Sequence, residues 1–129
     1  MSRRPVSVIP DGYFVLATPL GKAHFFVEID RGTETLARFK QKIHAYKEYF
    51  DSGAYERRYG TKSMRVLTVA TGEGRLTNLW RATGEVTAAI GGQRRFWFGL
   101  ADRLTVDTVL NAPVWVIAGE QTARPLIDR

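Results

Sequence analysis

The 129-residue sequence contains no cysteine, which excludes disulfide bonds, catalytic thiolates and zinc sites built on cysteine. Histidine is almost as scarce, and His24 and His44 are too few and too far apart for the ligand set of a zinc hydrolase. No apolar run approaches the roughly 20 residues that a membrane-spanning helix needs. No long apolar segment follows residues 1–4 either, so a secretory signal is not expected and the cytoplasm is the expected compartment.

Acidic residues are outnumbered by basic ones, at 13 against 19, which gives a net charge of +6 and a pI of about 10.0. This balance favours a polyanionic partner, most simply a nucleic acid, although charge alone does not identify one. A hydrophobic fraction of 44% and a charged fraction of 25% are typical of a globular protein. The length predicts one domain over residues 1–129.

Two β-rich runs near the start of the chain, residues 13–16 and 24–30, flank a turn rich in proline and glycine and predict an antiparallel hairpin. Asp11 precedes the first run, and Glu28 and Asp30 end the second. The start of one hairpin strand lies beside the end of its partner, and alternate side chains share a face. The sequence therefore predicts three carboxylates at one end of the hairpin.

Such a cluster needs compensation, because each ionised pair about 4 Å apart costs roughly 4 kcal/mol at an effective dielectric constant near 20. A cation, a lysine or a bound proton can offset that cost, and carboxylates with water suit Mg²⁺ or Mn²⁺. Asp11, Glu28 and Asp30 are therefore the candidate metal ligands. The structural alternative is a turn at Asp11-Gly12 and a helix cap at Asp30, which leaves Glu28 unexplained in its apolar surroundings.

After the hairpin, apolar residues recur every three or four positions over residues 36–50 and predict an amphipathic helix, with Thr33 as its N-cap and residues 51–53 as its stop. Lys42 lies on the shoulder of the apolar stripe, next to Tyr46, and its ammonium is expected to reach toward the acids. Two other interpretations stay open. Lys42 can be an ordinary surface lysine, and Tyr46 can orient Lys42, contact phosphate or simply pack in the core.

The remainder of the chain predicts a mixed β-sheet flanked by helices, an α/β (α+β) fold. Its expected elements are a basic loop at 54–63, a buried strand at 64–70, a helix from 73 to about 84, a strand at 96–100, a weak helix or turn at 104–110, and an edge strand or packing segment at 113–117. Residues 84–94 are not assigned, except that 86–90 can extend the helix. The tail after Gly119 is expected to be loose.

The acidic motifs resemble those of the PD-(D/E)xK, or restriction endonuclease-like, nuclease superfamily. Pro10–Asp11 matches the pair that opens one core strand, and Glu28 matches the acid on the next. Asp30 stands where the superfamily usually has its lysine. Some branches place this function on the following helix as Gln-x-x-x-Tyr, and Lys42 and Tyr46 have that spacing.

The sequence more closely resembles the replication-relaxation family of plasmid and mobile-element proteins. The likeness rests on Pro-Asp-Gly at 10–12, Glu-x-Asp-Arg-Gly at 28–32, Lys-x-x-x-Tyr at 42–46 and later strands at 65–69 and 96–98. The resemblance implies a winged-helix DNA-binding domain and a core helix before the hairpin, neither of which this sequence supplies. A missing N-terminal domain or a homodimer that completes the fold is therefore expected.

The resemblance implies a DNA nuclease or nickase that depends on Mg²⁺ or Mn²⁺ and serves plasmid or mobile-element replication or transfer. The residues implied in catalysis are Asp11, Glu28, Asp30, Lys42 and Tyr46. The residues expected to contact DNA are Arg31, Arg57, Arg58, Lys62, Arg94 and Arg95. Two alternatives remain: a non-catalytic nuclease-like module that binds DNA or assembles a complex, and an unrelated basic α+β domain.

Overall fold

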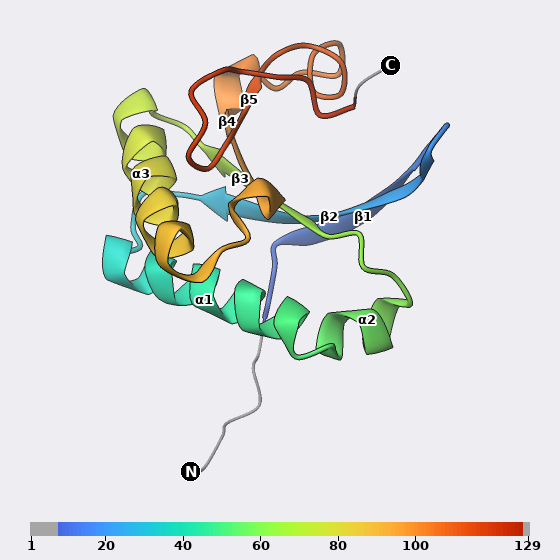
Figure 1. The fold of residues 1–129 in the computed structure, drawn as a ribbon. Coiled ribbons are helices and arrows are strands. Elements are labelled where there is room, and N and C mark those ends of the chain that lie inside the picture. The colour runs from blue at the N-terminus through green and yellow to red at the C-terminus, as the bar shows by residue number, and fades with distance from the viewer. Residues whose placement is uncertain (1–7, 128–129) are drawn as a thin grey trace.

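A five-stranded mixed sheet forms the centre of the protein in the computed structural model, which describes residues 8–127 (Figure 1). The strands lie in the order β1-β2-β3-β4-β5, the order in which they occur in the chain. The elements are β1 (Gly12–Thr18), β2 (Gly21–Asp30), α1 (Leu36–Asp51), α2 (Ala54–Tyr59), β3 (Arg65–Ala70), α3 (Glu73–Ile90), η1 (Gln93–Arg95), β4 (Phe96–Leu100), η2 (Ala101–Arg103) and β5 (Trp115–Ile117). The predicted α/β class is confirmed. The sequence also predicts a short basic arm over residues 1–8, of which residues 1–7 lie outside the described part of the chain.

The predicted hairpin is present, with β1 antiparallel to β2 and Gly12 paired with Val27. The hydroxyl of Thr18 donates to the carbonyl of Gly21 across the turn, over 2.6 Å. The backbone N–H of Asp11 donates to the carbonyl of Val27 over 2.9 Å, which continues the ladder by one residue. The start of β1 therefore lies beside the end of β2, as the sequence predicts.

Parallel pairing of β2 with β3 and of β3 with β4 requires two crossover connections, and helices supply both. Helices α1 and α3 cover the same face of the sheet (Figure 1). The core on this face contains Phe26 from β2, Ile43 from α1 and Leu79 from α3. Apolar burial between the helices and the sheet therefore fixes α1 against β2, where the predicted acids lie.

Helix α1 begins two residues later than the sequence suggests. The N-cap is Thr35, whose hydroxyl accepts a hydrogen bond from the N–H of Arg38 over 3.1 Å, so the prediction of Thr33 as the cap is wrong. The helix ends at Asp51 as expected. Gly53 follows with a φ of +83°, a conformation that glycine adopts without steric cost.

Two other predictions are corrected on this side of the sheet. The expected loop at 54–63 contains the short helix α2, in which Tyr55 is fully buried and Gly60 forms the left-handed C-cap. Helix α3 does not stop near residue 84 but continues to Ile90. Apolar packing overrides the weak helix propensity of Gly84, because Val86, two residues later, is buried in the core.

The opposite face of the sheet is covered by the C-terminal segment (Figure 1). Trp115 of β5 is buried there and pairs with Arg124 through two backbone hydrogen bonds of 3.1 and 2.7 Å. Leu126 is only 2% exposed, so the prediction of a loose tail after Gly119 is wrong. Residues 104–110 form turns, and β5 is an edge strand. Within residues 8–127, no helix is long and apolar enough to cross a membrane.

Candidate functional site

A pocket of about 200 Å³ lies between the end of β2 and the start of α1. Four of the five residues implied in catalysis line it, namely Asp11, Glu28, Asp30 and Lys42. The fifth, Tyr46, contacts Glu28 from the core of α1. The hairpin brings the three acids to this end of the sheet, and packing of α1 on the same face adds the lysine.

Glu28 is the most constrained of these residues and is only 5% exposed. Its Oε1 atom lies 3.0 Å from the ammonium of Lys42, and its Oε2 atom accepts a short hydrogen bond from the hydroxyl of Tyr46. Both carboxylate oxygens therefore have a partner from α1. Such pairing is what a buried carboxylate needs, because an isolated buried charge is strongly disfavoured.

Lys42 holds two acids at once, because its ammonium also lies 3.2 Å from Oε1 of Glu34. Burial opposes protonation of Lys42, but its hydrogen bonds to Glu28 and Glu34 and their negative charges outweigh burial and raise its pKa. Lys42 is therefore a fixed positive charge. Glu34 is a site residue that the sequence reasoning missed, although its position just before an amphipathic helix that carries Lys42 was a usable signal.

Asp11 is the most accessible of the acids. Its Oδ2 atom accepts a hydrogen bond from the backbone N–H of Ile29 over 2.7 Å, so Asp11 closes the open edge of β2 next to Glu28. This contact explains why an aspartate stands one residue before β1. It engages one carboxylate oxygen through a neutral donor and brings no cation to Asp11.

Asp30 has a different environment from the other two acids. Arg75 of α3 donates to both of its oxygens, from Nε to Oδ2 and from Nη2 to Oδ1, each over 2.8 Å. These hydrogen bonds lower the pKa of Asp30, and they outweigh the opposing effect of burial. The N–H of Gly32 donates to Oδ2 as well, over 3.1 Å. Asp30 therefore anchors the loop after β2 to α3 and does not cap α1.

Tyr46 is fully buried in the core cluster on the helix face. Burial, followed by the negative charge of Glu28, raises its pKa far above the ordinary value. The hydroxyl therefore stays protonated and donates to Glu28. This geometry favours an orienting role over direct contact with phosphate, and the ring packs against Phe26 at the same time.

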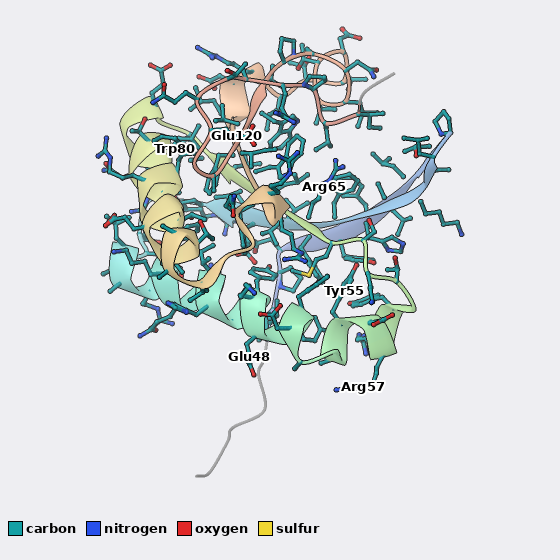
Figure 2. All side chains as sticks on the ribbon, in the orientation of Figure 1. Glu48, Tyr55, Arg57, Arg65, Trp80 and Glu120 are labelled. Carbon is teal, nitrogen blue, oxygen red and sulfur yellow. The ribbon has the colours of Figure 1, made fainter. Side chains whose placement is uncertain are left out.

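The residues expected to contact DNA do not form one surface. Arg31 lines the pocket. Arg57 and Arg58 are exposed on α2 (Figure 2), and Arg57 donates a hydrogen bond to the carbonyl of Ser52 over 3.3 Å. Lys62 is exposed near the end of α1.

The remaining two expected DNA contacts lie in η1 and differ in environment. The guanidinium of Arg95 lies 3.6 Å from the centre of the Phe50 ring and is partly buried. Arg94 is exposed, and its Nη1 atom lies 3.4 Å from Glu120. Arg94 is therefore the residue of this pair that an external ligand can reach.

The pocket carries an excess of negative charge. Its four carboxylates are those of Asp11, Glu28, Asp30 and Glu34, whereas the cations in contact with them are Lys42 and Arg75, with Arg31 exposed at the rim. No group of three or more Asp, Glu, His or Cys side chains in residues 8–127 is arranged to hold a metal ion. A divalent ion in this pocket would be held by Asp11 and Glu28 with water, and both oxygens of Glu28 already have partners from α1. Mg²⁺ is usually bound through one or two carboxylates and substrate phosphates.

Residues 2–64 match the family model described as replication-relaxation. The match spans just under half of the chain and includes the hairpin, α1 and α2. It therefore supports the resemblance over the part of the chain that carries Asp11, Glu28 and Lys42, and β3 to β5 lie outside it. No curated protein and no solved structure matches the chain significantly.

Proposed function

We propose that this chain is a metal-dependent DNA nuclease or nickase domain of the replication-relaxation family that acts in plasmid or mobile-element replication. The observation that carries the proposal is the convergence of Asp11, Glu28 and Lys42 on one pocket. These residues are separated by 17 and 14 positions in the sequence. The family match over residues 2–64 covers all three.

A PD-(D/E)xK-like fold is part of the proposal. The two strands of the hairpin and α1 follow one another in the order that this resemblance implies. Asp30 occupies the usual lysine position, but its charge is neutralised by Arg75. Lys42 supplies an ammonium 3.0 Å from Glu28 instead, which supports the idea that it replaces the missing strand lysine.

The proposed chemistry is hydrolysis of a phosphodiester bond. A divalent ion held by Asp11 and Glu28 would supply an activated water and neutralise charge on the phosphate. Lys42 is fixed and positively charged, so it can stabilise the negative charge that develops on a phosphate in the pocket. Tyr46 keeps Glu28 in place through a buried hydrogen bond. The exposed Arg31 at the rim adds a phosphate contact without sequence preference.

A non-catalytic DNA-binding or assembly module is the second candidate. Both oxygens of Glu28 and both oxygens of Asp30 are already bonded to side chains of this protein. If Lys42 and Arg75 already neutralise the carboxylates of Glu28 and Asp30, these carboxylates need no metal ion. In this case Lys42 and Arg75 serve stability, and the chain acts through its basic surface.

Nicking of supercoiled plasmid in Mg²⁺ or Mn²⁺ separates the two candidates. We expect cleavage by the wild-type chain and loss of at least 100-fold in Glu28→Gln and Lys42→Met, with folding checked by circular dichroism. The matched control is Glu48→Gln, an exposed glutamate on the same helix as Lys42 (Figure 2), and it should cleave normally. Cleavage that survives in both pocket variants ends the nuclease proposal.

Calorimetry with Mn²⁺ provides an independent measurement. A micromolar binding site that disappears in Glu28→Gln and persists in Glu48→Gln supports the nuclease. No heat of binding, together with no cleavage, favours the non-catalytic module.

A further inference from the structure

A groove of about 560 Å³ lies at the other end of the sheet, between the hairpin turn and the C-terminal segment. Its cationic lining residues are Lys22, Arg65, Arg94 and Arg124. A neighbouring hollow of about 570 Å³ shares Arg65 and Arg94 with the groove and adds Arg95. The two form a continuous depression along the first residues of β2, β3 and β4.

The groove is strongly positive, because no acidic residue lines either hollow. Glu120 is the one carboxylate in residues 8–127 that pairs with Lys22, Arg94 or Arg124, at 3.4 Å from Arg94 and 2.8 Å from Arg124. With Arg65 left out of the count, these three cations against one carboxylate leave an excess of two positive charges. In a low-dielectric cleft such an excess attracts polyanions.

Arg65 is held in place by the core beneath it, and Arg124 carries a buried donor with no partner. Arg65 stacks on Phe25 and Trp97, with its guanidinium carbon 5.6 and 4.8 Å from the ring centres, and donates to the carbonyl of Leu126 over 3.0 Å. The Nε atom of Arg124 is the only buried side-chain nitrogen or oxygen in the described part of the chain that has no hydrogen-bond partner. An unmet buried donor is costly, so an anion or water in the groove has a site to occupy.

We propose that this groove binds the phosphodiester backbone of a nucleic acid, as a second contact surface separate from the acidic pocket. Planar guanidinium groups bind phosphate oxygens well. The Trp97 ring is covered by Arg65 and is not open for base stacking. Binding in the groove therefore has no base preference and depends strongly on salt.

The groove and the pocket are far apart. Lys22 and Glu28 are six residues apart on β2, which is about 20 Å at roughly 3.3 Å per residue. Arg65 lies on the side of the C-terminal segment, whereas Tyr55 and Glu48 lie on the helix side (Figure 2). The groove can therefore bind DNA whether or not the pocket cleaves it.

Fluorescence anisotropy with labelled 20-nucleotide DNA of arbitrary sequence, single-stranded and duplex, tests the proposal in EDTA, where no cleavage occurs. The test variant is Lys22→Gln with Arg94→Gln, both exposed and remote from the core. We expect at least a tenfold loss of affinity near 0.1 M salt. The slope of log affinity against log salt should fall by about 1.4 for single strands or 1.8 for duplex, the value for two lost phosphate contacts.

The matched control is Arg38→Gln with Arg81→Gln, which removes the same charge from exposed positions on α1 and α3. It should change affinity by less than twofold and leave the slope unchanged. Equal losses of DNA affinity in the two double variants overturn the proposal. A groove variant that loses affinity for heparin but keeps its affinity for DNA overturns it as well. Binding in EDTA does not require the nuclease chemistry, so failure of the nuclease proposal and failure of the groove are distinguishable.

Discussion

Replacement of Arg75 by methionine tests whether the end of β2 depends on a buried ion pair. The side chain of Asp30 is 4% exposed and that of Arg75 is 23% exposed. Removal of one partner from a buried pair costs about 3 to 5 kcal/mol, because the remaining charge is left uncompensated. Water can reach part of Arg75, so we expect Arg75→Met to lose about 3 kcal/mol of unfolding free energy at pH 7.

The size of this loss should depend on pH. Arg75 lowers the pKa of Asp30 in the folded protein below its ordinary value of 3.8. The pair therefore contributes its full stability above that value, and the contribution disappears as the pH falls through the folded pKa. In Arg75→Met, burial without the cation raises the pKa of Asp30 instead. The difference between wild type and variant should then shrink to below about 1 kcal/mol near pH 3.

Urea unfolding followed by tryptophan fluorescence at several pH values measures both effects. The control is Arg103→Met, which breaks an exposed pair with Glu73 in which the two side chains are 64% and 75% exposed. Exposed pairs contribute about 0 to 1 kcal/mol, so the control should stay near wild type at every pH. A loss under 1 kcal/mol in Arg75→Met at pH 7, or a large loss that is independent of pH, refutes the reasoning.

Further changes probe the core on the two faces of the sheet. Tyr46→Phe removes the hydroxyl that donates to buried Glu28. The free energy of unfolding in urea should fall by about 2 kcal/mol, because a buried charged acceptor loses its donor. An unchanged midpoint would show that the hydrogen bond is dispensable. Gly99→Ala should cost about 1 to 3 kcal/mol because its Cβ would lie 3.0 Å from the Trp115 ring. Gly74→Ala, in open space on α3, should be neutral or stabilising by up to about 1 kcal/mol, and similar effects of the two glycine substitutions would contradict the packing argument.

The hairpin and the position of Lys42 follow from local rules. Alternation along β2 places Glu28 and Asp30 on one face, and helical spacing places Lys42 beside Tyr46. Antiparallel pairing then adds Asp11. Each step involves residues close in the chain or paired through a short turn, so the sequence alone predicts the acids and the lysine together.

The partner of Asp30 cannot be read from the same rules. Arg75 lies 45 residues later, at the start of α3, and its approach to Asp30 depends on how α3 packs across the sheet. Nothing in the local sequence distinguishes Arg75 from any other arginine near a helix start. The burial of the C-terminal tail does not follow from local rules either, because Leu126 packs against a face of the sheet formed by strands far earlier in the chain.

The acidic pocket and the basic groove lie at opposite ends of the parallel strands, and this separation has a consequence for binding. A phosphate that enters the pocket meets Asp11 and Glu28, which repel it. The groove around Arg65 and Arg94 attracts the same backbone. Added salt should therefore weaken attachment to the groove, whereas a divalent cation should be required before the pocket accepts phosphate. If cleavage and binding responded to salt and Mg²⁺ in the same way, the two ends of the sheet could not have separate roles.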